Sequence, residues 1–216
     1  TEAAVLEVAR GGLLRRGLPI PQVDAALVTN VAEDHLGQYG INSVAALTAA
    51  KLMVAKAASK TLVLNADDEN LPAFVQRSQQ ENKQAPSSEL ISVLAQEPNA
   101  SNLPENITWF SLNGHNPVIA DAKSNQQAVC FVRDGKIVYA SAGAETDIIE
   151  VNAIPMTLQG AAVHNVQNAL GAVALSKSLG IDNQAIQAAL GTFKSDAADN
   201  PGRGNLFEYR SAKVML

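Results

Sequence analysis

The chain has 216 residues, of which 47 % are hydrophobic and 17 % charged, and its formal net charge is −5. This length allows one substantial core, and the composition is that of an ordinary globular protein rather than a disordered one. The net negative charge, without a large cluster of Lys and Arg, argues against a nucleic-acid partner. The single cysteine excludes an internal disulfide, and we see neither a secretory signal nor an apolar run long enough for a membrane span, so we predict a cytoplasmic protein with no membrane partner.

Three apolar runs in the first third of the chain read as buried parallel strands, because each is short and ends in polar residues. They are residues 3–6, 25–28 and 61–64. Between the second and third runs, residues 43–58 are rich in Ala, Leu and Lys, with apolar side chains on one helical face, as is typical of a crossover helix. We therefore predict that residues 1–75 form a parallel βαβ part.

The middle of the chain predicts a surface excursion followed by antiparallel strands. Residues 76–106 crowd together Gln, Asn, Ser and Pro, which indicates a helix end and then a surface segment. Short strands are predicted after it, at 107–112, 128–132 and 137–140. The dipeptide Asp134-Gly135 supplies a tight turn between the last two. We expect antiparallel strands across residues 107–157.

Two Ala-rich helical patterns follow, at residues 165–179 and 183–193. Gly180 lies between them and suits the C-terminal cap of the first helix. We predict a helical pair within residues 158–199.

The last segment, residues 200–216, reads as a linker. Its opening Asn-Pro-Gly breaks the helical pattern, and residues 205–216 resemble a strand. Taken together, the elements predict the α/β fold class, with a mostly parallel sheet flanked by helices and a small antiparallel β portion.

Polar side chains follow the first two predicted strands, at the edge of a parallel sheet where ligands collect. The first strand leads into Glu7, and the second leads into a loop that contains His35. A carboxylate and a neutral imidazole can share a divalent ion, and nucleotide-bound Mg²⁺ takes only one or two protein ligands. One reading is a metal site at Glu7 and His35. The other is that Glu33 and Asp34 cap the next helix while His35 packs beneath it.

The string NVAEDHL at residues 30–36, followed by Lys51 and by the string NADD at residues 65–68, resembles the central domain of Mur ligases. The resemblance implies an enzyme that uses ATP and Mg²⁺, in which Glu7 and His35 help to hold the metal. It also implies that Lys51 is carbamylated, with Lys51 and His35 acting in catalysis.

A carbamate would turn the Lys51 cation into an anion, which could lie beside a metal instead of repelling it. The alternative for Lys51 is an ordinary solvated lysine on a helix. The polar residues Asn65, Asp67 and Asp68 are equally explained as turn formers after a strand.

Residues 160–170 (GAAVHNVQNAL) place Asn165 and Asn168 three residues apart at a helix start, so that both lie on one face. An amide offers a donor and an acceptor, as the recognition of an adenine edge requires. The similar element of Mur ligases lies against the adenine, so the resemblance implies that His164, Asn165 and Asn168 bind ATP. The alternative for these asparagines is helix capping.

The string NPGRGNLFE at residues 200–208 resembles the linker of Mur-type enzymes whose arginine approaches the ATP phosphates. Arg203 is the matching residue, and guanidinium geometry suits phosphate oxygens. The alternative is a surface arginine in a loop.

Residues 6–18 (LEVARGGLLRRGL), together with residues 200–208, resemble the cyanophycin synthetase branch of the Mur family. This implies an ATP-dependent amide ligase that works through an acyl phosphate and adds arginine to aspartate side chains of a polymer. The implied partners are ATP, an amino acid and a carboxylate substrate, and a homo-oligomer is left open. Arg10, Arg15 and Arg16 either contact an acidic polymer or are merely exposed.

The family's glycine-rich phosphate loop, which normally precedes the strand of Glu7, has no counterpart in this chain. We therefore expect a piece of a longer enzyme, inactive alone, that lacks the phosphate loop and the C-terminal domain. The alternatives are another Mur-type ligase, acting on a peptidoglycan precursor, folate or polyglutamate, and a non-catalytic binding or assembly domain. His115, Trp109 and Cys130 match no motif and read as structural.

Overall fold

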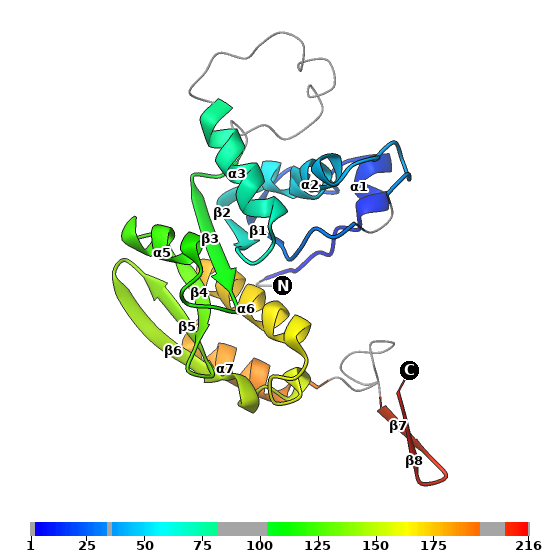
Figure 1. Ribbon diagram of the computed structural model, residues 1–216, viewed down its shortest axis with the longest axis vertical. Coiled ribbons are helices and arrows are strands. Elements are labelled where there is room, and N and C mark those ends of the chain that lie inside the picture. The colour runs from blue at the N-terminus through cyan, green and yellow to red at the C-terminus, as the bar shows by residue number, and fades with distance from the viewer. Residues whose placement is uncertain (1–2, 34–35, 82–102, 195–205, 216) are drawn as a thin grey trace.

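A six-stranded sheet with the strand order β1-β2-β3-β4-β5-β6 organises the protein in a computed structural model that describes residues 3–33, 36–81, 103–194 and 206–215 (Figure 1). Strands β1 to β4 are parallel to one another, and β5 and β6 continue the sheet in antiparallel fashion. The strands are β1 (Val23–Val28), β2 (Ala58–Asn65), β3 (Asn106–Ser111), β4 (Val129–Arg133), β5 (Lys136–Ser141) and β6 (Ala144–Glu150). This confirms the predicted fold class.

Helices cover both faces of the sheet (Figure 1). On β2, Leu62 and Leu64 join one buried cluster with α2, α3 and α5, whereas Val63 joins a second cluster beneath α6 and α7. Successive side chains of a strand point to opposite faces, so a sheet covered on both sides needs unbroken apolar runs. The helices are α1 (Arg10–Arg16), α2 (Val44–Leu52), α3 (Asn70–Glu81), α5 (Pro117–Ser124), α6 (Val163–Ser178) and α7 (Asn183–Thr192).

Helix α2 begins at a capped end and is followed by a 3₁₀ turn. The Ser43 hydroxyl accepts a hydrogen bond from the Ala46 amide at 3.2 Å, as an N-cap serine should. The helix ends at Leu52, and the 3₁₀ turn η1 (Met53–Lys56) leads directly into β2. The predicted helix over 43–58 is therefore too long, because residue 58 already pairs in the sheet.

The antiparallel portion depends on two tight turns. Asp134 and Gly135, between β4 and β5, have φ values of 50° and 75°, which fit the hairpin turn predicted from this dipeptide. Ala142 and Gly143, between β5 and β6, repeat the left-handed pair with φ values of 50° and 80°. After β6 the chain forms two 3₁₀ turns, η3 (Val151–Ala153) and η4 (Pro155–Thr157), and enters α6.

The predicted strand over residues 3–6 is wrong. This segment has no regular structure, and its Val5 side chain is 83 % exposed. An apolar run becomes a buried strand only when a neighbouring strand takes its backbone hydrogen bonds and other layers cover both of its faces. In the described part of the chain, β1 is the edge of the sheet and no strand pairs on its outer side.

The predicted antiparallel direction is also wrong for the strand over 107–112. The observed strand, β3, pairs in parallel with β2 and with β4. The reason is a helix that sequence reasoning missed, since α5 provides the crossover that a parallel connection needs. The Asn116 side chain caps α5 by accepting from the Val118 amide at 2.9 Å, and Pro117 occupies its first turn.

The two helices near the C-terminal side agree with prediction. Gly180 has a φ of 77° between α6 and α7, as a helix-ending glycine should. The single strand predicted over 205–216 is instead a hairpin of β7 (Leu206–Tyr209) and β8 (Ala212–Met215). Its turn residues, Arg210 and Ser211, adopt φ values of 48° and 64°.

Candidate functional site

The carboxyl ends of β1 and β2 are held together by side chains at the end of β2 and in the loop that follows it. The Asn65 amide nitrogen donates to the Thr29 carbonyl oxygen at 2.9 Å. One Asp68 carboxylate oxygen accepts from the Val31 amide at 2.5 Å, and the other accepts from the amides that start α3. These contacts support the interpretation of Asn65 and Asp68 as turn-forming residues.

Asp67 connects the same loop to the end of β3. Its carboxylate accepts from the Leu112 amide at 2.7 Å, from the Ser111 hydroxyl at 2.5 Å and from the Asn116 amide nitrogen at 3.2 Å. Three donors from a separate strand and loop make Asp67 a structural bridge along the carboxyl edge of the sheet. It fits the turn-forming interpretation as well.

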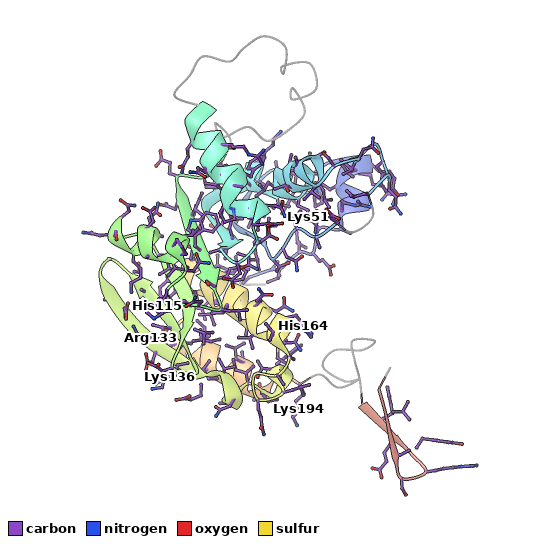
Figure 2. The ribbon with its side chains drawn as sticks, viewed as in Figure 1. Lys51, His115, Arg133, Lys136, His164 and Lys194 are labelled. Atoms are coloured by element: carbon purple, nitrogen blue, oxygen red, sulfur yellow. The ribbon has the colours of Figure 1, made fainter. Side chains whose placement is uncertain are left out.

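Lys51 lies at this edge, in the last turn of α2 (Figure 2). Its ammonium nitrogen donates to the Asn30 carbonyl oxygen, 3.1 Å away, in the loop that follows β1. The side chain is half-buried rather than extended into solvent. The fold therefore brings this predicted catalytic residue to the edge where parallel α/β sheets bind ligands.

The other predicted residues of this edge are placed only in part. Glu7 lies exposed in the irregular segment before α1. His35 and Arg203 lie outside the described residues. Among the residues that the structure describes, no group of three or more His, Cys, Asp or Glu side chains could hold a metal ion. A metal site made by Glu7 and His35 thus stays a prediction.

The start of α6 presents the residues predicted to bind adenine. His164 and Asn168 are exposed there, and His164 is seen at the first turn of the helix in Figure 2. Asn165 is half-buried, and its amide nitrogen donates to the Met156 carbonyl oxygen at 2.7 Å. Part of its hydrogen-bonding capacity is therefore used to fix α6 against the turn η4, while the exposed Asn168 amide faces solvent.

A cavity of about 610 Å³ lies between the start of α6 and the ends of β3 and β4. Its apolar lining includes Leu112, Val132, Val163 and Val166, and its polar lining includes Asn152. His164, Asn165 and Asn168 do not line it, because Val163 and Val166 lie on another side of the helix. Nothing in the sequence pattern signalled this cavity, since its walls come from four separated segments.

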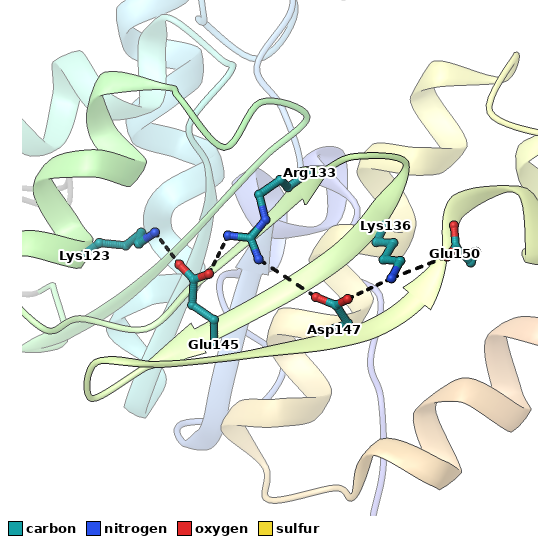
Figure 3. A network of polar contacts seen from close by, with 6 residues as sticks. All are labelled: Lys123, Arg133, Lys136, Glu145, Asp147 and Glu150. Atoms are coloured by element: carbon teal, nitrogen blue, oxygen red, sulfur yellow. Dashed lines mark hydrogen bonds and ion pairs between the residues drawn. The ribbon is translucent and has the colours of Figure 1, made fainter.

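A network of charged side chains crosses β4, β5 and β6 (Figure 3). Arg133 contacts Glu145 at 2.5 Å, and Lys136 contacts Asp147 at 3.0 Å and Glu150 at 3.7 Å. Hydrogen bonds from Lys123 and then Arg133 lower the pKa of Glu145. Positive and negative members alternate, so the network carries no net charge. It therefore stabilises the pairing register of the strands and offers no positively charged site for an anionic ligand.

Burial explains the structural role that the sequence predicts for Trp109 and Cys130, but not for His115. Trp109 is buried in the core between the sheet and the layer formed by α2, α3 and α5. Burial also raises the pKa of the Cys130 thiol far above its ordinary value, so this side chain behaves as a small apolar group. His115 is exposed, and its backbone amide donates to the Asn113 side chain.

The fold and the polar carboxyl edge of the sheet define a class. A family model described as Mur ligase middle domain matches residues 1–176, so the chain belongs to the Mur ligase family. Among similar proteins, cyanophycin synthetase from Synechocystis sp. is 31 % identical over 95 % of this chain and 21 % of the relative. Cyanophycin synthetase from Geminocystis herdmanii is 31 % identical over 100 % of this chain and 22 % of the relative.

A second kind of relative covers less of the chain. UDP-N-acetylmuramoylalanine–D-glutamate ligase from Leuconostoc citreum is 28 % identical over 82 % of this chain and 30 % of the relative. The chain spans about a fifth of the length of the cyanophycin synthetases that it matches. Within the described residues, no helix is long and apolar enough to cross a membrane.

Proposed function

We propose that this chain contributes the ATP-using domain of an amide ligase that adds arginine to aspartate side chains of cyanophycin. The observation that carries the proposal is the position of Lys51. Its amine lies 3.1 Å from the Asn30 carbonyl oxygen, at the carboxyl edge of a parallel sheet in a chain of the Mur ligase family. The choice of substrates rests on the similarity to cyanophycin synthetases along the whole chain.

The described residues fit a bound adenine by their chemistry. Asn168 is exposed at the start of α6 and offers both a donor and an acceptor, and His164 beside it offers an imidazole ring. Asn165 retains its amide oxygen as an acceptor after donating to Met156. We assign these three residues to the nucleotide base, and Arg203 to the phosphates.

The assignment for Mg²⁺ is Glu7 and His35. The Glu7 carboxylate is exposed and makes no hydrogen bond or ion pair with another described residue, so it is free to serve as a ligand. Its oxygen chemistry suits Mg²⁺, which takes few protein ligands when nucleotide supplies the others. Bound Mg²⁺ would neutralise phosphate charge during phosphoryl transfer.

The proposed reaction joins a carboxylate to an amine at the expense of ATP. A substrate carboxylate oxygen takes the γ-phosphoryl group of ATP and gives an acyl phosphate, with ADP as the leaving group. The amine then attacks the acyl carbon and forms the amide, with release of phosphate and a proton. The chain's residues position the reactants, with Lys51 and His35 at the reacting end. Such positioning supplies roughly 7–11 kcal/mol of barrier reduction in well-oriented systems, so activity should depend on every bound component being held.

A second candidate is a Mur-type ligase with another acceptor. The specific observation in its favour is the similarity to the D-glutamate ligase of Leuconostoc citreum. The string LEVARGGLLRRGL at residues 6–18, which resembles cyanophycin synthetases, favours the first candidate.

The test is ATP-dependent incorporation of labelled arginine into an aspartate-containing primer, run with the 216-residue chain and with the full-length gene product. We expect turnover by the full-length product and none by the chain, because no glycine-rich phosphate loop occurs within residues 1–216. His35→Ala and Arg203→Ala should abolish turnover. Activity with D-glutamate and a peptidoglycan precursor would support the second candidate instead. Inactivity with every acid and amine offered would refute both.

A further inference from the structure

Two half-buried glycines and two exposed arginines lie on one face of helix α1. Gly11 and Arg15 are four residues apart, as are Gly12 and Arg16, so each pair lies on adjacent turns. Leu13 lies on the other side of the helix and is only 3 % exposed, where α1 packs against α2. We name the exposed side, with Tyr39 from the loop after β1, the glycine–arginine face.

Two contacts fix the position of the Arg15 guanidinium on this face. Its guanidinium carbon lies 5.4 Å from the centre of the Tyr39 ring, and its Nε donates to the Gly11 carbonyl oxygen at 2.9 Å. Tyr39 itself remains 52 % exposed. Because a guanidinium carries five N–H donors in a rigid plane, the two terminal nitrogens of Arg15 remain available for a carboxylate.

No described carboxylate pairs with the two arginines of this face. Favourable interaction with the helix dipole explains why basic residues occur in the last turn of α1. It does not explain the glycines. The positive charge of this face is therefore not neutralised within the described part of a chain whose net charge is −5.

The glycines have no structural cause in the described fold. Each costs a helix about 1 kcal/mol relative to alanine. A Cβ atom at Gly12 would meet nothing within 4 Å, and one at Gly11 would make only ordinary contacts with Tyr39 and Arg15. Neither glycine needs a left-handed backbone. The open space at Gly12 permits the close approach of another chain to the helix backbone.

We propose that the glycine–arginine face binds the carboxylates of an aspartate-rich acceptor peptide, an inference that rests on the proposed function for the nature of the acceptor. Arg15 and Arg16 contact successive carboxylates, and Gly12 lets the peptide backbone lie close to α1, whereas Tyr39 and Arg15 already cover Gly11. Nucleic-acid binding needs a larger basic surface than two arginines on a protein of net negative charge. We therefore favour an acidic peptide as the ligand of this face.

The test measures fluorescence anisotropy of a labelled oligo-aspartate with the 216-residue chain, without ATP or arginine. Arg15→Gln and Arg16→Gln should each weaken binding about fivefold, which corresponds to an exposed ion pair of about 1 kcal/mol. Gly12→Leu should abolish binding through bulk without lowering the melting temperature. The matched controls, Arg77→Gln on α3 and Gly191→Leu on α7, should bind like the parent chain, and added salt should weaken binding.

Unchanged binding in the Arg15, Arg16 and Gly12 variants would overturn the proposal, as would tighter binding of oligothymidylate or of phosphatidylserine vesicles than of oligo-aspartate. These outcomes are separate from the ligation test. If the peptide binds this face but nothing is ligated, only the proposed function fails. If arginine is ligated while all three variants bind the peptide normally, only the present proposal fails.

Discussion

The amine of Lys51 donates a hydrogen bond to the backbone carbonyl oxygen of Asn30 across 3.1 Å. Lys51 belongs to the last turn of α2, whereas Asn30 follows β1. The contact connects the crossover helix to the loop that leads toward His35. It places the one described residue with a predicted catalytic role beside the polar edge of the sheet.

Replacing Lys51 should therefore separate activity from stability. In the full-length gene product we expect Lys51→Gln to lower arginine incorporation about 100-fold, the scale of a misplaced reacting group. The free energy of unfolding should fall by less than about 1 kcal/mol, because the hydrogen bond of Lys51 to Asn30 is partly solvated. Lys56→Gln, in the 3₁₀ turn η1, is the matched control and should leave both quantities unchanged. An active Lys51→Gln enzyme would contradict the catalytic role, and an intact mass showing one added CO₂ on Lys51 would support carbamylation.

Asp67 should be important for stability. Asp67→Asn replaces an acceptor of three hydrogen bonds by a group that also donates, which leaves a mismatch at the end of β3. We expect a loss of about 1–3 kcal/mol in the free energy of unfolding, measured by urea titration. Asp121→Asn removes the same charge from the exposed surface of α5 and should have almost no effect. Equal urea midpoints for the two variants would show that the bridge between the loops contributes nothing.

The charged network should make stability depend on pH through Glu145. Hydrogen bonds from Lys123 and Arg133 lower the pKa of Glu145 from its ordinary value of 4.5. A depressed folded-state pKa stabilises the protein above pH 4.5, and this contribution disappears as the pH falls through the folded-state pKa. Glu145→Gln should thus lower the melting temperature at pH 7, by an amount worth about 0.5–1 kcal/mol.

Below pH 4.5 the difference between the parent chain and Glu145→Gln should shrink as the pH falls, because protonation of Glu145 removes the charge on which its ion pairs depend. Glu105→Gln, at an exposed position before β3, serves as the control. Differential scanning calorimetry from pH 7 to pH 3 measures the comparison. A Glu145→Gln effect that does not change with pH would indicate packing rather than charge.

Two glycines should respond in opposite ways to alanine. A Cβ atom at Gly114 would lie 2.8 Å from Cδ2 of Phe131, a side chain only 1 % exposed that has no room to move away. Gly114→Ala should destabilise the protein by about 1–3 kcal/mol. Gly191 lies in α7 with open space around it, so Gly191→Ala should stabilise by about 0.4–1 kcal/mol. Thermal unfolding of both variants checks the pair, and a stable Gly114→Ala protein would show that the contact with Phe131 relaxes freely.

Local pattern alone predicted the elements whose causes lie close together in the chain. The strands at 25–28 and 61–64 follow from short apolar runs, and the two late helices follow from their composition and from Gly180 between them. The turn at Asp134-Gly135 was predictable because an aspartate and a glycine tolerate positive φ. The motifs also indicated which polar residues to examine, and family membership is confirmed over residues 1–176.

Contacts between distant segments decided the rest, because pairing energy depends on which neighbour is present. Residues 3–6 have the composition of a strand, but in the described part of the chain no strand lies beside them. Strand β3 is parallel because the missed helix α5 crosses over to β4. The sequence singled out Lys51 and Asn165, but their partners, Asn30 and Met156, are 21 and 9 residues away. Hydrophobic periodicity indicates which face of a helix or strand a residue occupies. It does not indicate which distant loop its polar group will contact, so only the folded structure shows these hydrogen bonds.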